Sequence, residues 1–189
     1  MGRRLLTMTL IGVVGASTAM SAIGRIKQHG RAIVEDHSED VVAVASYLYS
    51  QRTHDGAWLL VEFAVQATPR IAVNRKELTL LGPGERTYPL ATQPQFLEDS
   101  QVLTALLQNA AIWRRPMSDY FSSRPAVRTI HFFAAPGGGV IQDSAVTNLD
   151  EVATGDLFFK SPDGKWSAGE YRLVLNHAKV KAELPIVLD

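Results

Sequence analysis

Short runs of β-branched and aromatic residues, separated by turn-forming residues, recur from position 41 to the end of the chain and constrain its fold more than any other feature. Such runs favour strands, and the glycine, proline and aspartate residues between them favour turns. Many short strands joined by turns are typical of an antiparallel β-sandwich. The expected strands lie at 41–50, 57–67, 71–73, 78–81, 86–90, 127–134, 140–146, 156–160, 171–176 and 180–188.

The first two runs are separated by a segment that contains Asp55 and Gly56, a pair that tolerates the positive φ of hairpin turns. We therefore expect 41–50 and 57–67 to pair as a hairpin. Side chains alternate between the two faces of a strand, so the second run has one strongly apolar face and one mixed face. The apolar face, which we expect to enter the core, carries Leu59, Val61, Phe63 and Val65, and the mixed face carries Trp58, Leu60 and Glu62.

One segment departs from the strand pattern and has the period of an amphipathic helix. It predicts a helix at about 97–115, inserted between strands of the sandwich. Acidic and hydroxyl side chains at 98–100 suit a helix start, and Pro116 stops the helix after two arginines. Its apolar positions are Val102, Leu103, Leu106, Leu107, Ala110 and Ala111.

The N-terminal region is basic and apolar: residues 1–31 carry no acid, and the stretch Leu5–Ile23 carries no charge. At about 1.5 Å per residue this stretch reaches roughly 28 Å, close to the thickness of the hydrocarbon core of a bilayer. It predicts either a transmembrane helix kept as an anchor or a signal peptide cut near Ala19 or Ala22; a buried helix of a soluble domain is a third interpretation. We divide the chain into a hydrophobic anchor or signal peptide with basic flanks at 1–30, an acidic linker at 31–40 and a sandwich domain at 41–189.

The anchor interpretation is favoured because the apolar run continues beyond Ala19 to Ile23 before the basic residues begin. Gly12 with Ala16, and Gly15 with Ala19, have the small-xxx-small spacing that lets membrane helices pack closely. Basic residues flank both ends, so charge alone does not orient the span. The arginine-rich start is similar to that of a signal sequence, which favours a single-pass protein of a bacterial inner membrane with its domain on the extracytoplasmic side. The opposite orientation remains an alternative.

Three segments of the strand-rich region combine strands with glycine turns and aromatic residues. Residues 74–90 contain a strand, a glycine turn and an aromatic-x-leucine strand, and residues 155–162 and 169–175 are two further aromatic strands. In these segments the chain resembles immunoglobulin-like domains of bacterial exported or membrane-anchored proteins. The resemblance implies an immunoglobulin-like sandwich with a binding or accessory role and no catalytic residues. The lipoprotein form of such domains is excluded, because the chain has no cysteine.

No motif for catalysis or cofactor binding stands out. The chain has no cysteine and no serine in a Gly-x-Ser-x-Gly elbow. The glycines at 137–139 are followed by Val140 rather than by the lysine of a phosphate-binding loop, which favours a hairpin loop. The acidic segment 36–40, together with His54, could supply metal ligands, but its spacing matches no established pattern. We expect no enzyme activity, cofactor or metal, and the balance of 19 basic and 19 acidic residues argues against nucleic acid as a partner.

The end of the expected helix and the residues just after it, 113–121, concentrate residue types that are enriched in protein interfaces. The expected partner-binding residues are Trp113, Arg114, Arg115, Tyr120 and Phe121. In a second interpretation these residues contact the membrane interface, which suits Trp and Tyr. In a third, the aromatic residues join the core, and the helix caps one end of the sandwich. We predict a non-catalytic accessory subunit that is anchored in the bilayer by residues 5–23 and docks onto other subunits of a membrane complex. A respiratory or photosynthetic complex is one such setting. The alternative is a secreted module that binds a small ligand or a surface polymer after signal cleavage.

Overall fold

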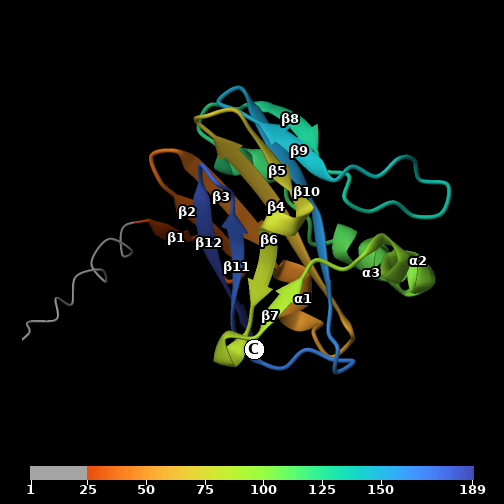
Figure 1. The fold of residues 1–189 in the computed structure, drawn as a ribbon. Helices are drawn as coiled ribbons and strands as arrows, with labels where there is room; N and C mark the ends of the chain where they lie inside the picture. The colour runs from red at the N-terminus through yellow and green to blue at the C-terminus, as the bar shows by residue number, and fades with distance from the viewer. Residues whose placement is uncertain (1–24) are drawn as a thin grey trace, which may run out of the picture.

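The computed structural model describes residues 25–189, which form a mainly β structure with three sheets, as the strand pattern predicts (Figure 1). The six-stranded sheet has the order β1 (Ile26–Gln28), β2 (Ile33–His37), β3 (Val41–Ser46), β4 (Trp58–Ala67), β10 (Glu151–Lys160) and β8 (Ala126–Thr129). The four-stranded sheet has the order β12 (Lys181–Leu188), β11 (Gly169–Asn176), β6 (Leu78–Leu81) and β7 (Thr87–Pro89). The third sheet pairs β5 (Ile71–Asn74) with β9 (Ser144–Thr147).

The main core lies between the six-stranded and the four-stranded sheets, because its buried side chains come from both. The predicted apolar face of β4 is confirmed: Leu59, Val61, Phe63 and Val65 all lie in this core. Trp58 and Leu60 point to the opposite face, where a second apolar cluster forms. We call the side of the six-stranded sheet that faces away from the four-stranded sheet its outer face.

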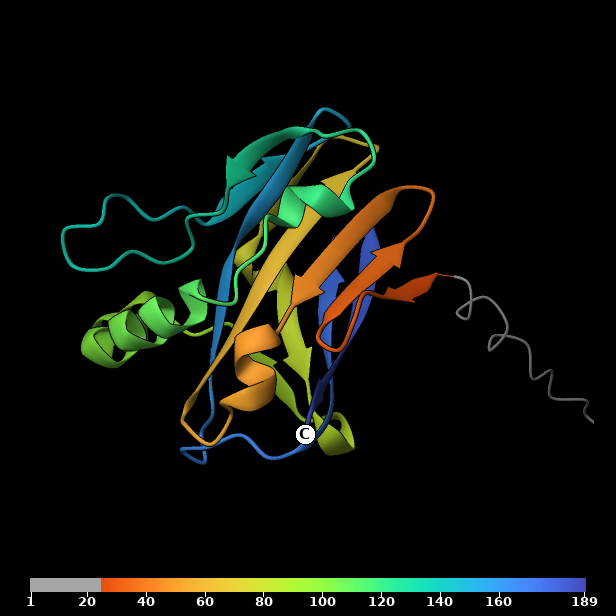
Figure 2. The ribbon, with the colours of Figure 1, turned by 180° about the vertical axis from the view of Figure 1, so that it is seen from behind.

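The helices are short; in Figure 2, α1 and η3 lie in front of the six-stranded sheet, and α2 and α3 project to one side of it. They are α1 (Leu48–Arg52), α2 (Gln93–Glu98) and α3 (Ser100–Ala111), with single 3-10 turns η1 (Arg75–Glu77), η2 (Pro83–Glu85) and η3 (Met117–Tyr120). The predicted amphipathic helix corresponds to α3, whose buried residues are Leu103, Leu106 and Ala110. It begins later and ends earlier than 97–115, because α2 is a separate helix capped by Thr92 and the chain leaves α3 after Ala111.

The predicted hairpin of 41–50 with 57–67 is correct in its pairing, since β3 and β4 are antiparallel, but residues 47–50 are not a strand. Helix α1 replaces the end of the first arm. Its buried Ser50 takes the place of a strand partner: Ser50 Oγ donates to the Leu60 carbonyl at 2.8 Å and accepts from the Leu60 N–H at 2.9 Å. One hydroxyl therefore satisfies both backbone groups of Leu60.

The predicted acidic linker at 31–40 is wrong, because β2 lies inside the six-stranded sheet between β1 and β3. Glu35 and Asp36 are both buried and both paired. Glu35 bonds to His29 at 2.6 Å and to His37 at 3.1 Å, and Asp36 bonds to Arg25 and to the Glu183 N–H. A carboxylate can be buried where a positive charge or a hydrogen-bond donor binds it. The acidic sequence of β2 can therefore form a buried strand.

The end of the predicted N-terminal unit thus belongs to the folded domain: Arg25 also donates to the Lys181 carbonyl, Ile26 packs against the main core, and His29 bonds to Glu35. No helix among residues 25–189 is both long and apolar enough to cross a membrane. The expected span Leu5–Ile23 and the helix-packing residues Gly12, Gly15, Ala16 and Ala19 lie outside the described residues.

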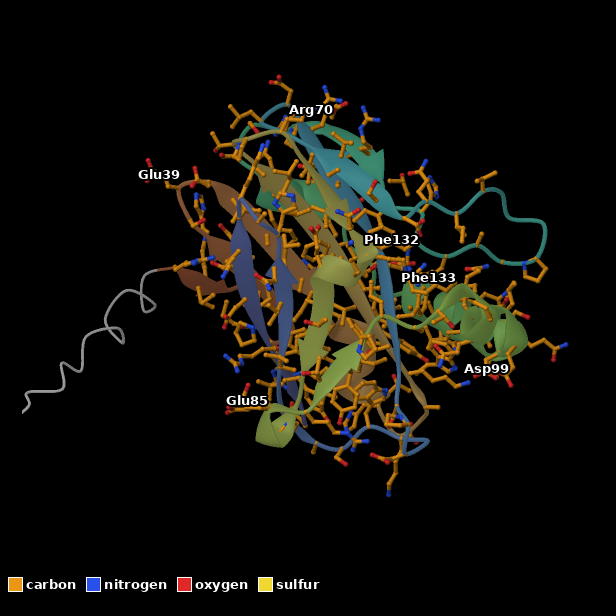
Figure 3. All side chains as sticks on the ribbon, in the orientation of Figure 1. Glu39, Arg70, Glu85, Asp99, Phe132 and Phe133 are labelled. Atoms are coloured by element: carbon orange, nitrogen blue, oxygen red, sulfur yellow. The ribbon has the colours of Figure 1, made fainter. Side chains whose placement is uncertain are left out.

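Strand β8 departs from the antiparallel prediction, because it runs parallel to β10 along one edge of the sheet. It is also shorter than the predicted 127–134. Beyond it Phe132 enters the main core, whereas Phe133 also packs against the outer-face cluster (Figure 3). Gly155 allows the approach of this segment, since a Cβ there would lie 2.6 Å from Ile130 Cβ.

Candidate functional site

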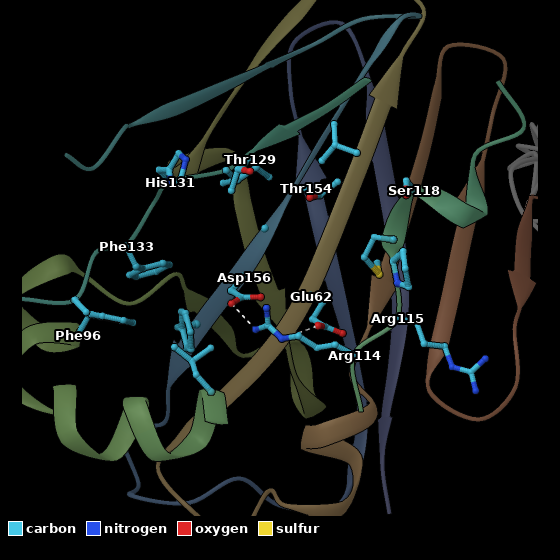
Figure 4. Close-up of a pocket in the computed structure, with 18 residues that line it drawn as sticks. Glu62, Phe96, Arg114, Arg115, Ser118, Thr129, His131, Phe133, Thr154 and Asp156 are labelled. Atoms are coloured by element: carbon cyan, nitrogen blue, oxygen red, sulfur yellow. Dashed lines mark hydrogen bonds and ion pairs between the residues drawn. The ribbon is translucent and has the colours of Figure 1, made fainter. Parts of the chain in front are cut away.

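A cleft of about 550 Å³ opens on the outer face of the six-stranded sheet (Figure 4). At one end of this face α2 and α3 cover Trp58, Leu60 and Phe158. At the other end Phe121, with η3 beside it, covers Val44 and Val152. The cleft lies between these two covered areas and is bordered by the segment 114–118 on one side and by 127–135 on the other. Its volume is in the range of sites that hold a small molecule or a partner side chain.

The floor of the cleft carries two carboxylates and one guanidinium. Glu62 of β4 and Asp156 of β10 are direct partners in the antiparallel register, so their side chains lie side by side. Arg114, which follows α3, reaches over both: its Nε lies 3.1 Å from Glu62 Oε1 and its Nη2 lies 2.6 Å from Asp156 Oδ2 (Figure 4). Arg114 thereby ties the segment behind α3 to the centre of the sheet.

Burial and charge set the protonation of this group of residues. Burial raises the pKa of the Glu62 carboxyl above its ordinary value, and Arg114 only partly offsets this. For Arg114, burial alone would lower the pKa of the guanidinium, but Asp156 and Glu62 outweigh it and the pKa is raised. The arginine therefore stays charged and holds the two carboxylates in place.

The other end of the cleft is aromatic. Phe96 of α2, Phe158 of β10 and Phe133 form a cluster in which the ring centroids lie 5.1–5.3 Å apart. Arg75 fixes this cluster from outside the cleft: its guanidinium lies 4.7 Å from the Phe133 ring centroid and donates to the Phe132 carbonyl at 2.7 Å. The cleft thus joins an apolar wall to a polar floor within one cavity.

Only some of the predicted partner-binding residues face solvent. Trp113 is 44% exposed, with the Arg52 guanidinium 4.9 Å from its ring centroid. Arg115 lies at the edge of the cleft, whereas Tyr120 is half-buried and packs edge-on against His29.

The prediction for Phe121 is wrong, because Phe121 is 4% exposed and packs in an apolar cluster with Ile33 and Val152. The alternative interpretation, in which this aromatic residue joins the core, is correct for it. Arg114 faces the sheet rather than a partner, since both its ion pairs are internal.

Sequence reasoning missed most of the cleft. Its aromatic wall comes from positions 96, 133 and 158, which share no sequence spacing. One signal was visible: Glu62 interrupts a long apolar strand on the face opposite to the core. Among residues 25–189, no three histidine or acidic side chains lie close enough together to hold a metal ion. Side chains of the acidic segment 36–40 bind different partners instead: Asp36 pairs with Arg25, and His37 contacts Glu35.

Comparisons of the chain with protein-family models, curated proteins and solved structures find no match. Interpretation of the cleft therefore depends on its chemistry. Arg114 engages both carboxylates, and the aromatic wall has no reactive group. The arrangement can bind a group that is apolar at one end and forms hydrogen bonds at the other.

Proposed function

We propose that this chain is a non-catalytic binding domain with an immunoglobulin-like arrangement of sheets, and that its cleft receives an apolar side chain of a partner protein. The observation that carries this proposal is the aromatic wall of Phe96, Phe133 and Phe158, which lines the cleft beside its polar floor. Phe133 is the half-buried member of this wall, and Phe96 and Phe158 are buried next to it. Partner side chains that fill such pockets contribute most of the binding energy in many interfaces. Arg115 and Ser118 at the edge of the cleft supply hydrogen-bond donors to the surrounding rim.

The proposed setting is the one that the N-terminal sequence favours. A chain anchored in a bacterial inner membrane by residues 5–23 would present this domain outside the cytoplasm, as an accessory subunit of a membrane complex. Intact-mass measurement of the protein isolated from native membranes tests this setting. A mass that includes residues 1–22 supports the anchor, and a chain cut near Ala19 or Ala22 in the soluble fraction contradicts it.

A matched pair of substitutions on α3 tests the cleft. Leu107 lines the cleft, and Val102 on the same helix is 59% exposed and does not. We expect Leu107→Trp to fill the cleft and to abolish partner recovery when the full chain is purified from native membranes, while Val102→Trp leaves it unchanged. Equal recovery with both variants contradicts the proposal. Once the partner is purified, its affinity can be titrated directly. We expect Leu107→Trp to bind it more weakly than the unchanged chain and Val102→Trp to bind it equally well.

A small amphipathic molecule is the second candidate occupant, because the cavity volume and mixed lining suit one. Native mass spectrometry of the purified full chain distinguishes the two. A bound mass of a few hundred daltons that Leu107→Trp removes and Val102→Trp retains favours the small ligand and the secreted-module alternative.

A further inference from the structure

Strands β8 and β9 lie beside each other at the top of the view in Figure 1, at the two ends of a long loop that projects to one side. Among residues 25–189, one backbone hydrogen bond joins the two arms, from the Gln142 N–H to the His131 carbonyl at 2.7 Å. Away from this bond the arms border a groove of about 760 Å³, lined by residues 127–129, 131, 142–146 and 151. The two strands are therefore neighbours that do not form a ladder.

The backbone of β8 directs one row of its polar groups into this groove. On the β10 side, Ala126 donates to the Asp150 carbonyl at 2.8 Å and Ile130 donates to the Thr154 carbonyl at 2.6 Å. Because these groups alternate in direction along a strand, the N–H and C=O of Val127 and Thr129 point away from β10. The only strand that pairs with β8 in the described residues is β10.

The backbone of β9 also directs one row of its N–H and C=O groups into the groove, from the side opposite to β8. Its partner is β5, and the bond from the Arg75 N–H to the Asp143 carbonyl at 3.0 Å sets the direction of alternation. The N–H and C=O of Ser144 and Val146 consequently point away from β5 and toward the arm that carries β8. Among residues 25–189 these N–H and C=O groups have no backbone partner, so two rows of donors and acceptors face one groove.

We infer that this groove accepts an extended segment of the partner polypeptide, which adds as a strand to the free edge of β8. The inference rests on the proposed function and deepens it, because Val127, Thr129 and His131 line both the groove and the cleft. In an added strand, the residues opposite Val127 and Thr129 would point to the outer face, where the aromatic wall lies. Backbone bonds would then hold the segment while one apolar side chain enters the cleft.

The other outer edges of the two large sheets are protected against such pairing. Strands β1 and β7 have three residues each, β7 ends in Pro89, and β12 contains Pro185. Short strands and prolines are devices that block edge pairing. Neither β8 nor β9 contains a proline, so the edges that border the groove lack this protection.

Charge in the groove specifies the segment further. Arg128 and Glu151 bond to each other, so this pair adds no net charge to the groove. Asp143 is exposed and forms no ion pair with another of residues 25–189, which favours a lysine or arginine at that end of the segment. The partner segment is thus extended, with one large apolar residue and one basic residue.

Proline substitutions test the strand addition without breaking the sheet. Val127→Pro and Thr129→Pro remove N–H groups that point into the groove, and the N–H groups directed at β10 are kept. The controls Val127→Thr and Thr129→Val keep the N–H and change only the side chain. The probe is a random seven-residue peptide library displayed on phage and selected on the full chain, followed by titration of the synthesised winners.

We expect the library to yield enriched peptides. Their affinity for each proline variant should fall about tenfold, because one or two hydrogen bonds are lost. Their affinity for the two controls should be unchanged. Peptide binding should also slow hydrogen exchange at the amides of Val127 and Thr129. No enrichment, or unchanged affinity for the proline variants, overturns the strand addition. If those peptides lose affinity only with Leu107→Trp, the cleft function stands and the strand addition fails. If they lose it only with the prolines, the strand addition stands and the role of the cleft fails.

Discussion

Replacement of Arg114 by methionine tests the physical account of the cleft floor. Arg114 bonds to Glu62 at 3.1 Å and to Asp156 at 2.6 Å, and these two carboxylates are direct neighbours across β4 and β10. Methionine keeps most of the length of the arginine stem and removes the charge. The substitution therefore leaves two adjacent acids on the sheet without their shared cation.

The magnitude follows from how exposed the three side chains are. Removal of one partner of a fully buried pair costs about 3–5 kcal/mol, and an exposed pair contributes about 0–1 kcal/mol. The side chain of Arg114 is 38% exposed, whereas those of Glu62 and Asp156 are 14% and 24% exposed, which places this site between the two limits. We expect a loss of about 1–2 kcal/mol in the free energy of unfolding at neutral pH, or about 2–8 °C in Tm for a domain of this size.

The loss should depend on pH in a definite direction. The pKa of Glu62 in the folded state is already raised above its ordinary value of 4.5, mainly by burial. A raised carboxyl pKa gives stability that is fully present below the unfolded value and is lost as pH rises through the folded value. Without Arg114 the folded pKa of Glu62 rises further. The cost of Arg114→Met is therefore largest at neutral pH and shrinks near about pH 4, where Glu62 is mostly protonated in both states.

Thermal unfolding followed by circular dichroism at several pH values measures this effect. Arg86→Met is the control, because Arg86 pairs with Asp163 on an exposed surface, and we expect a smaller change from it. The double variant with Glu62→Gln should recover part of the stability lost in Arg114→Met. A cost that equals that of the control, or that is the same at pH 4 and pH 7, would refute the reasoning.

Three further predictions concern the elements around the cleft. Ser50→Ala should cost about 1–3 kcal/mol in denaturant unfolding, because it leaves the N–H and C=O of Leu60 buried without a partner. Gly155→Ala should cost about 1–3 kcal/mol, because the new Cβ would clash with Ile130, and Gly56→Ala is its comparison, because Gly56 is exposed and a Cβ there would meet nothing within 4 Å. Burial raises the pKa of Glu35 but two histidines and Lys27 lower it more, so the net shift is downward. Its stabilising effect is present above pH 4.5 and is lost as the pH falls through the folded pKa, so Glu35→Gln should flatten the acid side of the stability curve, measured as Tm against pH.

The strands that carry the main core could be predicted from the sequence because their signal is local. In β4 the alternation of side chains is complete, and Leu59, Val61, Phe63 and Val65 lie in the core as expected. Helix α3 was predictable for the same reason, since its buried positions have helical spacing. These elements needed no information from distant parts of the chain.

Prediction failed where a distant partner decides the structure. Strand β2 contains adjacent buried acids, and one of them is satisfied by the Glu183 N–H from the other end of the chain. The strand prediction for 47–50 failed because Ser50 bonds to the backbone of a different strand. The cleft could not be foreseen as a whole, because its aromatic wall is assembled from α2, β10 and the segment after β8.

The composition of β10 explains why a cleft exists at this place. Its outer face is apolar at both ends, with Val152 under Phe121 and Phe158 under the helices, but Thr154 and Asp156 interrupt it in the middle. An apolar side chain at either position would let the two clusters merge into one covered surface, and replacing paired charges by apolar residues often stabilises a protein. The chain instead keeps a polar interruption that requires Arg114 to neutralise it. Polar residues that interrupt an apolar face, and so reduce the apolar area buried there, are expected at a binding site. This is the physical basis for placing the partner in the cleft over Thr154 and Asp156.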